Sequence, residues 1–183
     1  MATTDEYRIR IRAFERNKLI TLWDEICMNN TPDWSDGKAL EFLILRAFEL
    51  EGASIRWPFS VNILNENVEQ IDGVIHFNDI NLSVLAECKD HSKNIKIEPI
   101  SKLRNQLLRR PSGAIGAVFS TTDFTDPTLI LSQFLAPQTI LLWDRDNIDY
   151  CIRNAYFKGG LLKKYWFAIE EGFPNFDLTA KRF

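Results

Sequence analysis

The feature that most constrains the fold is a series of short apolar runs that alternate with amphipathic segments over residues 82–143. The runs cover residues 82–89, 114–119 and 139–143, and their richness in Val, Ile and Leu is typical of buried strands. The segments between them, residues 98–109 and 126–136, carry an apolar stripe or a helix-start signal and are predicted as helices. Strands separated by helices pair in parallel through right-handed crossovers. The sequence therefore predicts an α/β fold.

The first half of the chain predicts two helices followed by a strand meander. Residues 5–28 lack glycine and proline and carry a rough apolar stripe, so they are predicted as one helix. A second helix is predicted over residues 38–51, with Asp36 as its N-cap and Gly52 at its end. Extended segments follow at residues 54–59, 68–77 and 82–89. Joined to the later strands, this meander gives a central mixed β-sheet flanked by helices.

Two neighbouring strands of the meander carry the residues with chemical potential. Asp72 lies on one strand, and Glu87 and Lys89 end the next. Because side chains alternate along a strand, Glu87 and Lys89 share a face and Cys88 points the other way. The alternative is a pair of solvent-facing charges at a sheet edge, but the run before Glu87 is apolar on both faces, as in a covered strand. Two carboxylates that converge in a partly dry site repel each other, and a divalent cation removes that cost, so the pattern implies a bound ion.

A third carboxylate lies on an apolar helix face. On the helix predicted over residues 38–51, Glu41 shares its face with Ile44, Leu45 and Phe48. Such a carboxylate either reaches the site from the helix or is a surface glutamate whose apolar neighbours face sideways. The sequence leaves both interpretations open.

Charge is unevenly distributed along the chain. The formal net charge is -3, but residues 89–110 contain seven basic residues and only two acidic ones. A basic segment beside a carboxylate site suits a polyanionic substrate, because phosphate contacts supply most sequence-independent affinity for nucleic acids. The alternative for any one of these residues is a solvated helix face.

Composition and motifs exclude several other classes. The motifs of phosphate-loop, dinucleotide-binding, zinc-protease and serine-hydrolase proteins do not occur. Cys27, Cys88 and Cys151 are widely spaced, which favours buried free thiols over disulfides or structural zinc. The length of 183 residues predicts a single domain. Without a long apolar run or a signal-peptide pattern, we expect a cytoplasmic protein that does not cross a membrane.

The ordered set of motifs resembles the PD-(D/E)xK nuclease superfamily, and more narrowly the Mrr-like catalytic domain of type IV restriction enzymes. The matching stretches are Gly37-Lys38-Ala39-Leu40-Glu41-Phe42, Gln70-Ile71-Asp72-Gly73-Val74-Ile75 and Ala86-Glu87-Cys88-Lys89. They are similar to the family's first helix, its aspartate-glycine strand and its (Q/E)-C-K strand. Residues 116–125 and 140–144 resemble its next strand with a threonine-rich turn and its last strand. The resemblance implies a nuclease-like core over residues 37–152, between an N-terminal helical extension (1–36) and an aromatic-rich C-terminal one (153–183).

The same resemblance implies roles for the site residues. Asp72, Glu87 and the main-chain carbonyl of Cys88 would hold Mg²⁺ or Mn²⁺. Lys89 would position the attacking water or stabilise the transition state, and Glu41 would be an outer-shell or second-metal ligand. Glutamate replaces the glutamine that many Mrr-like members have before C-K, which favours metal binding. The candidates for nucleic-acid binding are Lys93, Lys96, Lys102, Arg104, Gln106 and Arg109.

The predicted function is that of a metal-dependent endonuclease acting on DNA, in restriction or defence against foreign DNA. A repair or recombination nuclease of the same fold, and a non-catalytic nucleic-acid-binding or assembly module, are the alternatives. The chain carries no recognisable DNA-reading domain, so target choice is expected to come from a homodimer, a partner protein or features of the substrate. A dimer is expected for double-strand breaks, since cutting both strands usually needs two active sites.

Overall fold

The computed structural model describes residues 2–180. In that range the helices are α1 (Thr4–Arg12), α2 (Arg16–Cys27), α3 (Lys38–Leu50), α4 (Glu98–Leu107), α5 (Asp126–Ser132), α6 (Arg145–Asn154) and α7 (Phe157–Glu171). The strands are β1 (Ser54–Arg56), β2 (Phe59–Ile63), β3 (Glu66–Ile71), β4 (Gly73–Phe77), β5 (Leu82–Lys89), β6 (Ala114–Ser120) and β7 (Ile140–Trp143). Among these helices, none has the length and apolar character needed to cross a membrane.

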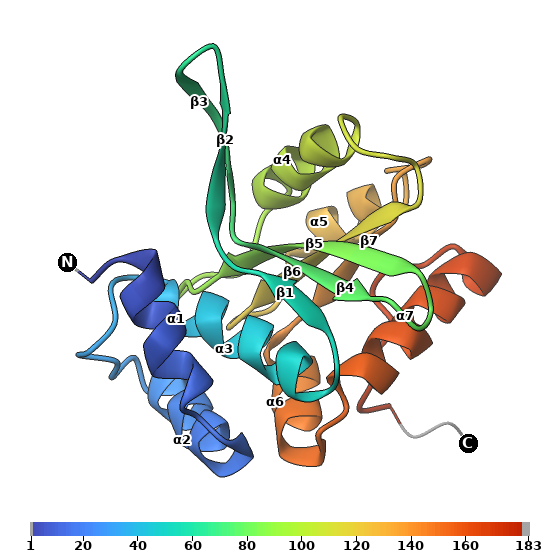
Figure 1. Ribbon diagram of the computed structural model, residues 1–183. Helices are drawn as coiled ribbons and strands as arrows, with labels where there is room; N and C mark the ends of the chain where they lie inside the picture. Colours follow the sequence, from blue (N-terminus) through green and yellow to red (C-terminus); the bar gives the residue numbers. More distant parts are fainter. Residues whose placement is uncertain (1, 181–183) are drawn as a thin grey trace.

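A five-stranded mixed sheet lies at the centre, in the order β1-β4-β5-β6-β7. Strand β4 pairs antiparallel with β1 and β5, whereas β5, β6 and β7 run parallel. Helices α3, α6 and α7 cover one face, and α4 and α5 cover the other (Figure 1). The predicted α/β class, with its parallel pairing over residues 82–143, is confirmed.

Alternation along β5 divides the core into two layers. Cys88 joins the larger apolar cluster, which also contains Phe48 of α3, whereas Leu85 joins the smaller cluster under α4. In the larger cluster the ring of Phe48 contacts the rings of Phe77, Phe119, Trp143 and Phe157. Glu87 has the same parity as Leu85, so its carboxylate lies on the α4 face of the sheet.

The N-terminal region differs from the prediction of one helix over residues 5–28, which was wrong. The chain turns between α1 and α2, where the carbonyl of Phe14 accepts a hydrogen bond from Arg46 of α3. Two shorter helices can each pack against α3. One straight helix could contact α3 over only part of its length. Asp36 is not the N-cap of α3 either, because Gly37 occupies that position with φ of 74° and no side chain caps the helix.

The meander also contains an element that the sequence did not predict. Strands β2 and β3 form a separate two-stranded hairpin, which we call the arm (residues 59–71). The arm projects from the sheet beside α4 (Figure 1). The predicted segments 54–59 and 68–77 are therefore each split between the sheet and the arm.

The C-terminal extension is helical over α7, whereas residues 172–180 are not helical, and a buried lysine anchors it. Lys164 of α7 is only 1% exposed, donates a hydrogen bond to the carbonyl of Phe176 and lies 5.4 Å from the ring centroid of Trp143. Burial lowers the pKa of Lys164 from 10.5 to about 8, although the negative charge of Asp144 acts in the opposite direction and raises it. The cysteines are free thiols as predicted, and Cys88 and Cys151 are buried, but the prediction of burial was wrong for Cys27, which is half-buried.

This shift predicts a specific pH dependence of stability. Between pH 8 and 10.5 the unfolded chain binds more protons at Lys164 than the folded chain does. The free energy of unfolding therefore increases as the pH rises through this range. A shift of this size corresponds to about 3 kcal/mol. We expect the stability of the wild type relative to Lys164→Met to rise by up to this amount between pH 7 and pH 10. Chemical denaturation measures it, with Lys163→Met as the control, and a difference that does not change with pH would contradict the assignment.

Candidate active site

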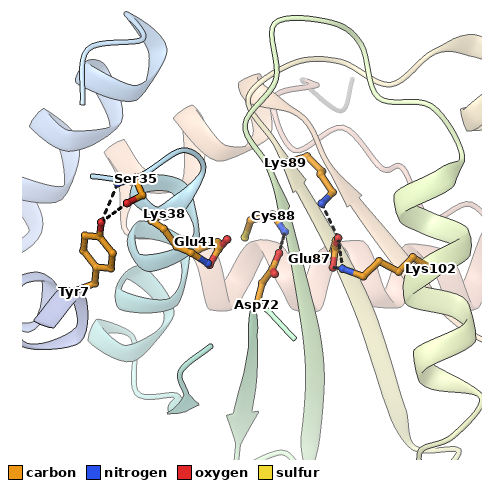
Figure 2. A network of polar contacts seen from close by, with 9 residues as sticks. All are labelled: Tyr7, Ser35, Lys38, Glu41, Asp72, Glu87, Cys88, Lys89 and Lys102. Atoms are coloured by element: carbon orange, nitrogen blue, oxygen red, sulfur yellow. Dashed lines mark hydrogen bonds and ion pairs between the residues drawn. The ribbon is translucent and has the colours of Figure 1, made fainter. Parts of the chain in front are cut away.

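The centre of the site is the carboxylate of Glu87, which is completely buried. Two lysines bind it, as Figure 2 shows. Lys89 Nζ lies 2.7 Å from Oε1, and Lys102 Nζ lies 2.9 Å from both oxygens. Lys89 comes from the same strand and Lys102 from α4, so this ion-pair cluster links β5 to the helix that covers it.

Asp72 stands next to this cluster, in the bend between β3 and β4. Its Oδ2 accepts a hydrogen bond of 2.8 Å from the main-chain N–H of Cys88 on β5. The bond fixes the aspartate against the strand that carries Glu87 and Lys89. Asp72 is only 8% exposed, so this hydrogen bond to the backbone lies in a largely dry environment.

Glu41 reaches the site from α3 because α3 packs unusually close to β4. A Cβ atom on Gly73 would lie 2.5 Å from Cδ2 of Leu45, so only glycine permits this approach. Leu45 and Glu41 are one helical turn apart and share a face, which turns Glu41 toward Asp72 (Figure 2). Lys38 holds the Glu41 carboxylate through a contact of 2.6 Å.

The three carboxylates influence one another. Burial, followed by the charge of Asp72, raises the pKa of Glu41 from 4.5 to about 7. Burial and the charge of Glu87 likewise raise the pKa of Asp72. Burial of Lys89 disfavours its charged form, but the hydrogen bond and charge of Glu87 outweigh this and raise its pKa. The site is thus a line of mutually repelling carboxylates with lysines at its two ends.

The donor set fits an oxygen-binding cation. Within residues 2–180 no three His, Cys, Asp or Glu side chains form a cluster ready to hold a metal ion. The set expected from the sequence, however, has two carboxylates and one main-chain carbonyl, and ions such as Mg²⁺ keep several water ligands. A cation at this position would relieve the repulsion that raises the carboxylate pKa values.

The residues after β5 are also held in place. The main-chain N–H of Thr121, at the end of β6, donates to the carbonyl of Lys89 at 3.1 Å. The hydroxyl of Thr121 donates to Asp90 at 3.0 Å and accepts from the N–H of His91. The threonine-rich turn therefore fixes the backbone on both sides of Asp90.

The residues predicted to bind nucleic acid lie in different environments. Lys93 and Lys96 are exposed on the loop after β5, and Arg104 is half-buried on α4. Gln106 is 4% exposed and donates to the carbonyl of Gln70, and Arg109 pairs with Glu69. Gln106 and Arg109 thus bind the base of the arm to α4, and a role in DNA binding stays a prediction for all of these residues.

Two lysines of the site were not assigned to it from the sequence. Lys102 was predicted only as a nucleic-acid-binding residue, although its neighbour Leu103 lies on the apolar stripe that packs on the sheet. That proximity to the stripe was the available signal. Lys38 gave no signal beyond its position three residues before Glu41.

A helix-covered mixed sheet with carboxylates and lysine where β4 and β5 meet defines the class of restriction endonuclease-like proteins. Residues 33–152 match the model of the family Mrr_cat, which is described as "Restriction endonuclease". The chain belongs to this family, as its motifs predicted. A comparison with curated proteins gave no match.

One solved structure supports the fold, and two others are more distantly similar. The small subunit (R.BspD6I2) of the heterodimeric restriction endonuclease R.BspD6I is 13% identical, with a TM-score of 0.52 over 85% of this chain and 89% of that one. AF1548, a protein of unknown function, is 15% identical with a TM-score of 0.45, and the match covers 67% of this chain and 58% of that one. The MspJI restriction endonuclease, solved with a 27-mer oligonucleotide, is 18% identical with a TM-score of 0.44, over all of this chain and 41% of that one. This chain thus spans well under two thirds of the length of the latter two proteins.

The raised pKa of Glu41 predicts that this carboxylate destabilises the metal-free protein. A carboxyl group with a raised folded-state pKa loses stability as pH rises from 4.5 to about 7. Glu41→Gln should therefore raise the free energy of unfolding by up to about 3 kcal/mol at pH 8, and by little at pH 4.5. Denaturation in EDTA tests this, with the exposed Glu170→Gln as the matched control. Equal effects at both pH values would show that the pKa of Glu41 is not raised in the folded protein.

Proposed function

We propose that this protein is a metal-dependent endonuclease that hydrolyses DNA phosphodiester bonds in restriction or defence against foreign DNA. The observation that carries the proposal is the line of buried carboxylates, with Lys89 beside Glu87, in a chain of the restriction endonuclease family. Carboxylates whose pKa values are raised by burial and by a neighbouring charge, as those of Glu41 and Asp72 are, concentrate at functional sites.

Asp72, Glu87 and the carbonyl of Cys88 are the groups that would hold Mg²⁺ or Mn²⁺, with Glu41 as an outer-shell ligand. Such an ion supplies charge neutralisation at the scissile phosphate and a lower pKa for a bound water. The hydrogen bond from the Cys88 N–H to Asp72 orients this aspartate before any ligand binds. The protein's own contribution is this orientation, together with the exclusion of bulk water from Glu87.

Lys89 acts as a fixed positive charge in the proposed reaction. Glu87 raises its pKa, so Lys89 stays protonated at neutral pH and does not serve as a general base. A protonated lysine stabilises negative charge that develops on phosphate oxygens. Lys102 neutralises Glu87 from the α4 side, and the exposed Lys93 and Lys96 lie on the adjoining loop, where they would contact the DNA backbone.

One chain presents one such site, so cutting both strands requires a second one. We propose that it comes from a second copy or from a partner protein. R.BspD6I2, which shares the fold, is by name the small subunit of a heterodimeric restriction endonuclease. Whether a supercoiled plasmid is nicked or linearised reports how many sites act together.

Cleavage of supercoiled DNA tests the proposed function directly. The wild type should give product with Mg²⁺ or Mn²⁺ and none with EDTA. Asp72→Asn and Lys89→Met should each lower the rate by about 100-fold or more, since each removes a charge that acts on the transition state. Both variants should bind the same DNA in EDTA to within a few-fold of the wild type.

Lys163→Met, on the half-exposed surface of α7, is the control and should cleave normally. Folded wild type that binds DNA without metal-dependent product would support a non-catalytic binding module instead. Full activity in both site variants would place the chemistry elsewhere in the molecule.

Lys102 provides a separate test of the metal site. Because its ammonium group occupies both oxygens of Glu87, it competes with a cation for this carboxylate. We expect Lys102→Gln to strengthen Mn²⁺ binding several-fold in calorimetry without DNA, and Glu87→Gln to abolish it. Lys96→Gln, on the exposed loop, is the control. Weaker Mn²⁺ binding by Lys102→Gln would show that Lys102 does not compete with the cation, and unchanged binding by Glu87→Gln would show that Glu87 is not a ligand.

A further inference from the structure

Neither the packing of the core nor the proposed chemistry explains why this protein has the arm. Its strands are joined by a two-residue turn, Leu64-Asn65, in which both residues have positive φ, 51° and 67°. Asn suits that conformation, whereas Leu is strained in it. The Leu64 side chain is also 93% exposed. A strained apolar residue at the tip of a projecting hairpin is unfavourable in the free protein and indicates a contact with a ligand.

The two faces of the arm differ in chemistry. Val61, Ile63 and Val68, together with Glu69, border a groove of about 470 Å³ beside the end of α4. Glu69 pairs there with Arg109 and Arg110. This face of the arm is therefore tied to the body of the protein.

The opposite face carries only uncharged hydrogen-bonding groups. Ser60 pairs with Gln70 and Asn62 pairs with Asn67 across the hairpin, so these four side chains share one face. The amide of Asn67 donates to the hydroxyl of Ser60 at 3.3 Å, which agrees with this placement. All four residues are exposed. We call them the amide face.

We propose that the arm lies in the major groove of duplex DNA beside the scissile phosphate, where the amide face contacts base edges and Leu64 contacts a thymine methyl group. The inference rests on the proposed function and identifies the arm as the element that selects the DNA target of the nuclease. A two-stranded ribbon fits the major groove, and Asn and Gln pair with the N6 and N7 edge of adenine there. The proposal therefore includes a preference for A·T pairs.

The position of the arm agrees with this role. Gln70 precedes the site residue Asp72 by two positions, so the amide face begins at the site. At about 3.3 Å per residue, β3 extends roughly 20 Å, or about six base-pair steps. Residues 59–71 contain no Lys or Arg, so the arm does not bind phosphates as a cationic element would. Of its two acidic residues, Glu69 is paired with Arg109 and Arg110, and Glu66 lies on the face opposite the amide face by strand alternation. The amide face is suited to discrimination between bases, whereas the basic residues near α4 would supply the positive charge that contacts phosphates.

The test is selection from a random duplex library by the full chain in EDTA, followed by sequencing. We expect the wild type to enrich sites with A·T pairs. The triple variant Asn62→Ala/Asn67→Ala/Gln70→Ala should bind the unselected library to within about threefold of the wild type but lose the enrichment by about tenfold or more. Replacing adenine by 7-deazaadenine in the selected site removes the N7 acceptor and should weaken wild-type binding without affecting the triple variant.

Two further variants separate the arm's role from folding and from surface polarity. Leu64→Asn/Asn65→Gly gives the turn its preferred residues, so the arm should stay folded while discrimination between thymine and uracil is lost. Gln133→Ala/Asn154→Ala removes exposed amides just after α5 and at the end of α6, and should select the same sites as the wild type. Circular dichroism confirms that each variant is folded.

The possible outcomes distinguish this inference from the function on which it rests. Wild type that binds duplex DNA without sequence preference, or a triple variant that keeps the preference, would overturn the inference and leave the nuclease proposal intact. Wild type that binds no duplex DNA would overturn both. Loss of enrichment in the triple variant together with insensitivity of the wild type to 7-deazaadenine would place the contact outside the major groove and overturn the proposal as stated.

Discussion

The ion-pair cluster around Glu87 is the interaction on which the arrangement of the site depends. A buried carboxylate without partners costs several kcal/mol, so the helix that brings Lys102 to it must stay close to β5. Gly116 on β6 permits that closeness, because a Cβ atom there would lie 2.8 Å from Leu103. The end of α4 then holds the base of the arm through Glu69. One buried charge thus fixes the helix, and the helix fixes the arm relative to the site.

Apolar packing imposes the unfavourable part of the electrostatics. Glu41 and Asp72 repel each other, and the charge of Asp72 adds to burial in raising the pKa of Glu41. They are held together because α3 contributes Phe48 and Leu45 to the main core, and the contact of Leu45 with Gly73 leaves no room for the helix to shift. The stability lost at the carboxylates is offset by core burial elsewhere. A cation that binds only this folded arrangement would stabilise it further by mass action.

The sequence predicted those features that depend on local periodicity. The alternation along residues 82–89 correctly placed Cys88 on the face opposite Glu87 and Lys89, and that face is the one that packs in the larger core. It did not predict the break between α1 and α2, because that turn is set by packing against α3. The arm was missed because Leu64 is a poor residue for a two-residue turn, so no turn signal separated its strands. The contact of Lys102 with Glu87 depends on how α4 docks on the sheet, and no local pattern encodes that.

The distribution of charge suggests how an acidic chain can act on DNA with selectivity. Phosphate contacts give affinity that is nearly independent of sequence, and too many of them would retain the protein at sites it should leave. Here the net charge is -3, and the basic residues gather in one segment, residues 89–110. Two arginines of that segment, Arg109 and Arg110, are engaged by Glu69, and Lys89 and Lys102 are engaged by Glu87. The cationic surface is therefore small, so base contacts by the uncharged amide face would contribute a larger share of the binding free energy than they would on a strongly basic protein.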